Sequence, residues 1–212
     1  MPSLKYILTA VLFAVILHAG TLPEYSSASE HSTGNAASNT SFTKFYNTIN
    51  ALINAKNWTE LNKYVHPDYG FYIYDNPGVR TVATNYRKFD ELTDTEGKKD
   101  EVVMNKMRDL KVDLKHKLIS GKVPSWDCGK DKWNKKGSYC QDLSSYPGLS
   151  ENVLWSSGNE DNPNQPQVIK AKAFGKLIRK HVIQTDGYDM YFAFIDGAWY
   201  IAVIDLCDKC SA

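Results

Sequence analysis

The stretch Tyr188–Cys207, "YDMYFAFIDGAWYIAVIDLC", carries the strongest fold signal in the chain. Two runs rich in aromatic and β-branched residues flank Asp196 and Gly197, a dipeptide preferred in two-residue hairpin turns. If the strands pair residue by residue outward from this turn, starting with Ile195 opposite Ala198, Tyr188 lies opposite Asp205. Both faces of the hairpin are largely apolar, which predicts a strand pair in a sheet that is covered on both sides or curls around a cavity.

Helical patterns precede this hairpin. Apolar residues at three- and four-residue steps predict a helix over about 42–55, with Ser41 as its N-cap. A second short helix is expected over 58–65, ending at "HPDYG" because the residue before a proline avoids helical angles. The run "GFYIYDNPG" predicts a strand closed by a turn. A third, amphipathic helix is expected over about 98–119.

The composition changes from about residue 121 to 167, where Pro, Gly, Ser, Asn, Trp and Tyr accumulate. We interpret this segment as a loop-rich insertion, with a short strand near 153–155. The chain is therefore expected to have an α+β fold with amino-terminal helices packed on a curved, mainly antiparallel sheet that ends in a long C-terminal hairpin. Residues 41–212 are long enough to form this single domain with one core.

The first 40 residues are not expected to belong to the domain. Residues 1–20 have the layout of a signal peptide, with Lys5 followed by an apolar run that ends in small residues. This run is shorter than the roughly 20 apolar residues of a membrane-spanning helix. Residues 21–40 are rich in Ser, Asn, Ala and Thr and predict a flexible leader. We expect a secreted or periplasmic protein without a stable membrane anchor.

The near-neutral charge balance argues against nucleic acid and anionic membranes as partners. The chain has 25 basic and 24 acidic residues, and removing residues 1–20 takes away one lysine and no acid, which leaves 24 of each. No lysine- or arginine-rich block of the kind that tracks phosphates is present, so no nucleic-acid partner is expected. No phosphate loop, nucleophile elbow or cluster of metal ligands appears, so neither a cofactor nor a metal is expected.

Four cysteines, Cys128, Cys140, Cys207 and Cys210, favour disulfide bonds in an exported protein. The C-terminal pair lacks the following helix that a redox CxxC motif requires, and the first pair is too widely spaced for a zinc site. Local pairing of Cys128 with Cys140 and of Cys207 with Cys210 is favoured, because the first bond would order the loop between them. Cross-pairing stays open, since it avoids the strain of the small C-terminal ring.

A family resemblance rests on the two amino-terminal helices, the "VHPDYGFYIYDNPG" segment and the final hairpin with its cysteine-bearing end. These features resemble the cone-shaped α+β proteins of the nuclear transport factor 2-like class, in particular uncharacterised secreted bacterial members. The resemblance covers about residues 41–77 and 180–212. It implies a curved sheet around a helix and a pocket at the open end, which members use for isomerisation, dehydration, hydrolysis or binding.

Three residues are candidates for acid–base chemistry. Asp205 lies on the same side of the expected hairpin as Tyr188 and Trp199, where an apolar surface would raise its pKa and suit a general base. The alternative is an acid at a strand end that reaches solvent. His66 and Asp68 are candidates for an acid–base pair, or else they stabilise the turn that ends the second helix.

The chain contains 13 tyrosines and five tryptophans, and such rings stack well on sugars and flat ligands. Most of them alternate along predicted strands and are explained by the core. Those proposed to bind a ligand lie on the hairpin or in the insertion: Tyr188, Trp199, Trp126, Trp133, Tyr146 and Trp155.

Two functions follow from these candidates. The first is non-catalytic binding of a small molecule, glycan or partner protein through an aromatic-rich pocket or loop. The alternative is a small hydrolase or isomerase that uses acid–base residues in the cone pocket. Titratable groups within hydrogen-bond reach in one pocket would favour the enzyme, and a pocket filled by Trp199 and Phe194 would exclude both.

Overall fold

The computed structural model describes residues 34–78, 80–90, 92, 99–112 and 117–210. The predicted signal peptide and most of the predicted leader lie outside these residues. No helix in the described ranges combines the length and apolar character needed to cross a membrane.

The helices are distributed along the whole described chain. They are α1 Gly34–Asn54, α2 Trp58–Leu61, the 3₁₀ helix η1 Asn62–Tyr64, α3 Glu101–Asp109, α4 Gly148–Ser156 and α5 Pro166–Gly175. The strands are β1 Phe71–Asp75, β2 Val82–Tyr86, β3 Leu118–Ser120, β4 Trp126–Asp127, β5 Lys132–Trp133, β6 Ser138–Asp142, β7 Ile178–Gln184, β8 Asp189–Ile195 and β9 Ala198–Asp205. The predicted α+β class is confirmed.

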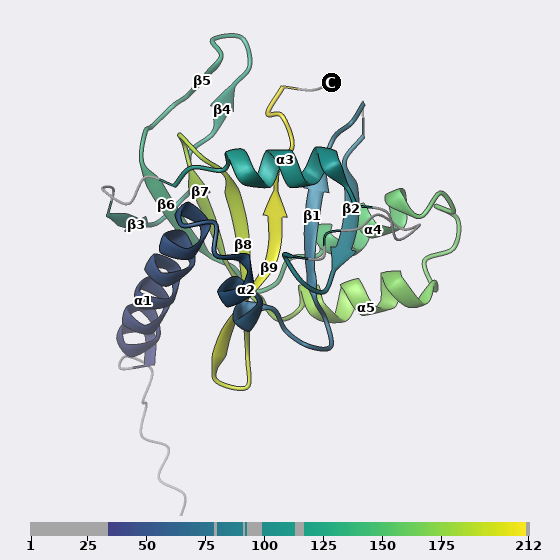
Figure 1. Cartoon of the computed structure of the whole chain (residues 1–212), viewed down its shortest axis with the longest axis horizontal. Coiled ribbons are helices and arrows are strands. Elements are labelled where there is room, and N and C mark those ends of the chain that lie inside the picture. The colour runs from purple at the N-terminus through teal and green to yellow at the C-terminus, as the bar shows by residue number, and fades with distance from the viewer. Residues whose placement is uncertain (1–33, 79, 91, 93–98, 113–116, 211–212) are drawn as a thin grey trace, which may run out of the picture.

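Seven of the described strands form one mixed sheet in the order β2-β1-β9-β8-β7-β6-β3 (Figure 1). Neighbouring strands are antiparallel except for β1 with β9 and β3 with β6, which are parallel. The parallel pair β1–β9, second and third from one edge, joins the early strands to the C-terminal ones. Strands β4 and β5 form a separate two-stranded ribbon.

Helices cover the sheet on both faces, so the domain has three layers. The face beneath α1, α2 and α3 buries a core that includes Phe42, Ile49 and Phe192. The opposite face packs against α4 and α5 through a second core that includes Tyr72 and Phe174. Burial on both faces explains why β8 and β9 are apolar at almost every position.

The turn between β8 and β9 has the expected chemistry. Asp196 and Gly197 both have positive φ, 49° and 82°, as a two-residue hairpin turn of the Asp-Gly kind requires. The predicted register holds from this turn as far as the pair Phe192–Ile201. Beyond that pair, Ala202 is an extra residue in β9, and the register shifts by one.

This bulge makes the predicted position of Asp205 wrong. Asp205 pairs with Asp189, and not with Tyr188. Since a shift of one residue moves a side chain to the other face, Asp205 lies on the face covered by α4 and α5, away from Phe192 and Trp199.

Three predicted elements have different boundaries or types. Helix α1 already begins at Gly34, within the segment expected to be a flexible leader. Helix α3 ends at Asp109 because Leu110 has extended backbone angles, and Ile119 lies in strand β3. The segment expected as a strand near 153–155 belongs to α4, where Leu149 and Val153 are buried at helical spacing.

The favoured disulfide pairing was wrong. Cys128 bonds to Cys210, with 5.7 Å between their Cα atoms, while Cys140 and Cys207 are free thiols. Cys140 points into the core from the middle of β6, so it cannot reach the ribbon that carries Cys128. The bond ties the β4–β5 ribbon to the C-terminus.

Replacing Phe42 with alanine is expected to lower the free energy of unfolding by about 3–5 kcal/mol, because the fully buried ring packs on Trp199 and Phe192. Phe194 on the same hairpin is exposed, and Phe194→Ala should cost clearly less. Urea denaturation of both variants measures the difference. Equal losses would contradict the described burial of α1 against the hairpin.

Mass mapping of the oxidised protein under non-reducing conditions should recover one cross-linked peptide pair that joins Cys128 to Cys210. Alkylation after unfolding should label Cys140 and Cys207. Cys128→Ser is expected to destabilise the protein by about 2–5 kcal/mol, since the bond closes a long loop of 82 residues. Recovery of a peptide linking Cys128 to Cys140 would contradict this connectivity.

Candidate functional site

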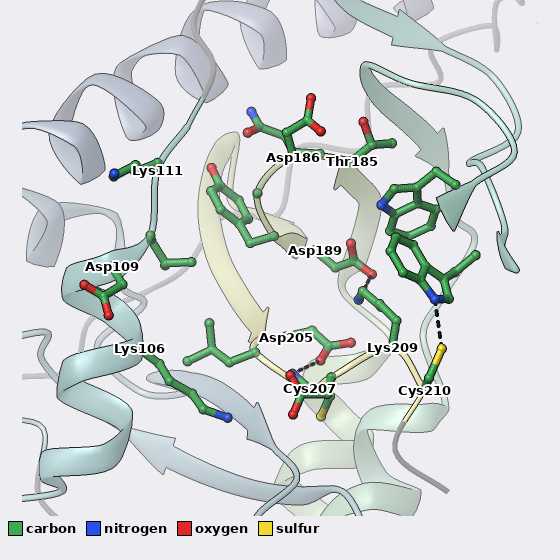
Figure 2. Close-up of a pocket in the computed structure, with 18 of the residues that line it drawn as sticks. Lys106, Asp109, Lys111, Thr185, Asp186, Asp189, Asp205, Cys207, Lys209 and Cys210 are labelled. Carbon is green, nitrogen blue, oxygen red and sulfur yellow. Dashed lines mark hydrogen bonds and ion pairs between the residues drawn. The ribbon is translucent and has the colours of Figure 1, made fainter. Parts of the chain in front are cut away.

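A pocket of about 940 Å³ lies where β8 begins and β9 ends (Figure 2). Its walls come from the end of α3 and the residues after it, the turn between β7 and β8, the β4–β5 ribbon, and residues 205–210. Three lysines, Lys106, Lys111 and Lys209, line it. Six aspartates also line it, namely Asp109, Asp131, Asp186, Asp189, Asp205 and Asp208. The pocket therefore has a formal excess of three negative charges.

The C-terminal strap, residues 206–210, forms one wall and is anchored along its length. Leu206 donates its backbone N–H to the carbonyl oxygen of Tyr74 at 2.9 Å. The backbone N–H of Asp208 donates to Oδ1 of Asn76, also at 2.9 Å. The disulfide at Cys210 then fixes the end of the strap. These contacts hold the side chains of the strap in place beside the start of β8 and the end of β9.

The carboxylates of Asp189 and Asp205 come from directly opposite positions on β8 and β9. Asp189 is only 6% exposed, and its Oδ2 accepts a hydrogen bond from Nζ of Lys209 at 2.8 Å. Oδ1 of Asp205 accepts from the backbone N–H of Cys207 at 2.9 Å. Figure 2 shows Lys209 pointing at Asp189, with Asp205 beside them.

Burial raises the pKa of Asp189 to about 6, although the Lys209 ammonium opposes the shift. The Asp205 carboxylate adds a smaller upward contribution through like-charge repulsion. Asp189 is thus an unusually basic carboxylate at the floor of the pocket.

His181 lies behind Asp189 on the same face of the sheet. Its ring stacks on Tyr191 with 4.1 Å between centroids, and its Nε2 is 4.0 Å from Oδ2 of Asp189. Burial, with a smaller contribution from the nearby Lys209 charge, lowers the pKa of His181 to about 4, so the imidazole is neutral at pH 7. Nε2 of His181 and Oδ1 of Asp189 are buried with no hydrogen-bond partner among the described residues.

Two tryptophans of the β4–β5 ribbon form the aromatic wall. Trp126 and Trp133 pair across the ribbon, edge to face, with 5.2 Å between ring centroids. Nε1 of Trp126 donates to Sγ of Cys210 at 2.9 Å, which adds to the covalent link between ribbon and strap. Nζ of Lys209 lies 5.9 Å from the ring centre of Trp133, within cation–π range.

Four of the sequence-predicted site residues line this one pocket: Asp205, Tyr188, Trp126 and Trp133. Tyr188 reaches inward from the pocket wall, because its hydroxyl donates to Oδ1 of buried Asn50. Burial raises its pKa well above the usual value, so it stays a neutral phenol.

The remaining predicted residues lie elsewhere. Nδ1 of His66 accepts from the backbone N–H of Asp68, which fits the alternative that both residues stabilise a turn. Trp199 is buried in the core beside α1, and the Tyr146 ring stacks on Tyr191 beneath α4. Trp155 is exposed and stacks with Arg80.

Asp189 and Lys209 were not singled out from the sequence. The register predicted from the turn placed Asp189 opposite Ile204, and only the Ala202 bulge brings it to Asp205. A single lysine between two cysteines carries no signal of its own. The sequence contains one relevant signal: each hairpin strand has an acidic residue at the end far from the turn, Asp189 in β8 and Asp205 in β9.

No protein-family model, curated protein or solved structure matches this chain. The comparisons therefore give no support to the resemblance to the nuclear transport factor 2-like class. Within the described ranges, no group of three or more His, Cys, Asp and Glu side chains is arranged to hold a metal ion.

The shifted pKa values predict opposite effects of pH on stability. The pKa of His181 in the folded protein lies below its ordinary 6.5. Its contribution to folding stability is therefore fully present above pH 6.5 and is lost as the pH falls toward 4. The pKa of Asp189 in the folded protein lies above its ordinary 3.8. Its contribution to folding stability is therefore fully present below pH 3.8 and is lost as the pH rises through about 6.

We therefore expect His181→Phe, which keeps the ring stack, to gain stability relative to wild type as the pH falls from 6.5 to 4. Asp189→Asn should gain relative to wild type as the pH rises from about 4 to 6. Urea denaturation across this pH range measures both differences. Curves that stay parallel to the wild type would show that these groups keep ordinary pKa values.

Proposed function

We propose that the protein is a non-catalytic binding protein whose ligand is a small molecule held in the pocket between the β4–β5 ribbon and the C-terminal strap. The observation that carries this proposal is the convergence of two tryptophans and a carboxylate pair on one pocket. Its volume of about 940 Å³ lies within the range of roughly 300–1,000 Å³ typical of small-molecule sites. This size favours a small molecule over a glycan chain or a partner protein.

The internal contacts of the carboxylates favour binding over catalysis. Asp189 is paired with Lys209, and Asp205 accepts a backbone N–H, so both are held in place by their own chain. Such groups orient a ligand well. Asp205 in particular is poorly placed to exchange a proton with a substrate, because its Oδ1 already accepts the backbone N–H of Cys207.

An acid–base enzyme remains the second candidate, and one observation favours it. Asp189, with its pKa of about 6, faces Asp205 across the strands, and Lys209 lies within hydrogen-bond reach. A buried carboxyl group whose pKa is raised toward neutral suits a general acid or a general base in a hydrolase or isomerase.

We further propose that the protein works in an oxidising compartment, as a secreted or periplasmic protein. The Cys128–Cys210 bond supports this location, since disulfides persist outside the reducing cytosol. Nothing in the proposed binding function requires a membrane or nucleic acid.

A thermal-shift screen of small molecules against the oxidised protein tests the proposal. Compounds that bind in the pocket should lose about tenfold or more in affinity with Trp133→Ala, because the aromatic wall is removed. The matched control is Trp155→Ala, which removes an exposed ring outside the pocket and should leave affinity unchanged. Equal effects of the two variants would contradict this site, and turnover that Asp205→Asn abolishes would favour the enzyme.

A further inference from the structure

The Lys209 ammonium occupies a cation site that the pocket itself provides. On one side is the Asp189 carboxylate, 2.8 Å from Nζ, and on another is the Trp133 ring, 5.9 Å away at its centre. A carboxylate combined with an aromatic face is the arrangement that proteins use to recognise organic ammonium groups.

Asp189 belongs to the floor of the pocket independently of Lys209. Its side chain is nine-tenths buried, it is held by the β8–β9 ladder, and its Oδ1 has no hydrogen-bond partner among the described residues. A buried carboxylate with a spare acceptor favours a donor with several N–H groups. A primary ammonium has three.

Lys209 is by contrast the more exposed partner in this pair. It extends from the strap on four methylene groups, and its side chain is 27% exposed. Its ammonium can therefore leave Asp189 for solvent at a modest cost while the strap stays in place. The pocket is also much larger than one lysine head group, which leaves room for the body of a ligand.

We propose that Lys209 is an internal substitute for a ligand, and that the pocket binds small primary amines that carry a flat or apolar group. The amine takes the place of the Lys209 ammonium between Asp189 and Trp133. This inference rests on the proposed small-molecule binding and names the class of ligand. It also means that the tethered lysine competes with the ligand and weakens its apparent affinity.

The charge of the pocket supports this class. Six aspartates face three lysines, and Lys106 is already paired with Asp75 at 2.6 Å on the opposite wall. When Lys209 swings away, the pocket retains a net negative potential that attracts a cation and repels an anion.

Benzylamine and its uncharged analogue benzyl alcohol provide the test, measured by isothermal titration calorimetry at pH 8, where Asp189 stays ionised. Lys209→Met removes the competing ammonium and keeps an apolar stem of similar length. We expect it to bind benzylamine about tenfold or more tightly than wild type. Asp189→Asn should abolish benzylamine binding. Benzyl alcohol should bind weakly and equally to wild type and Lys209→Met.

The matched control is Lys130→Met, which removes the same charge from an exposed ion pair with Asp127 outside the pocket. It should leave benzylamine affinity within about twofold, since exposed charges are screened. A second measurement needs no substitution. In the wild type, benzylamine should shift the NMR signal of the Lys209 ammonium, and benzyl alcohol should not.

The outcomes separate the two proposals. If the pocket binds other compounds through Trp133 but prefers no amine, the class of ligand is wrong and the proposed function stands. If Lys209→Met and Lys130→Met bind benzylamine equally and the ammonium signal does not move, Lys209 is only a structural ion-pair partner. If no compound binds to any variant, both proposals fail.

Discussion

Antiparallel pairing of β8 with β9, with Ala202 as an extra residue in β9, is the interaction on which the pocket depends. The hairpin is buried on both faces, so its register is strongly specified by what each side chain meets. Before the bulge, Phe192 and Trp199 enter the core beneath α1. After it, Asp205 moves to the other face and meets Asp189 at the end of the sheet. One extra residue therefore converts two separate acids into a carboxylate pair.

The pair would be costly if it stood alone, since the buried Asp189 and the partly buried Asp205 repel each other and lose hydration. The strap supplies the compensation, because Lys209 binds Asp189 and the amide of Cys207 binds Asp205. The disulfide then holds this strap against the tryptophan ribbon. Fold and site are thus linked through five residues at the very end of the described chain, and the same residues that stabilise the acids also limit access to them.

His181, which lies behind Asp189, is neutral and therefore does not compete with Lys209 for the Asp189 carboxylate. Its imidazole stacks on Tyr191 and contributes no charge at pH 7, so the lysine is the cation that meets Asp189 directly. An ion pair of one buried and one partly exposed group contributes little net stability, because desolvation offsets much of the attraction. A pair of this kind is easily exchanged for a similar one, which is why an external amine is a reasonable competitor.

Local patterns in the sequence determined the helix in α1, the strand β1, the Asp196–Gly197 turn and the need for cover on both faces of the final hairpin, because periodicity and turn chemistry depend on neighbouring residues. Trp126, Trp133, Tyr188 and Asp205 were also recognised as candidates from their residue types. Only the tertiary structure decided that these four meet, that Asp189 joins them through the bulge at Ala202, and that Cys128 reaches Cys210 across 82 residues. Bulges and long-range bonds arise from how separate elements pack, and packing energy is shared among residues that no local pattern connects.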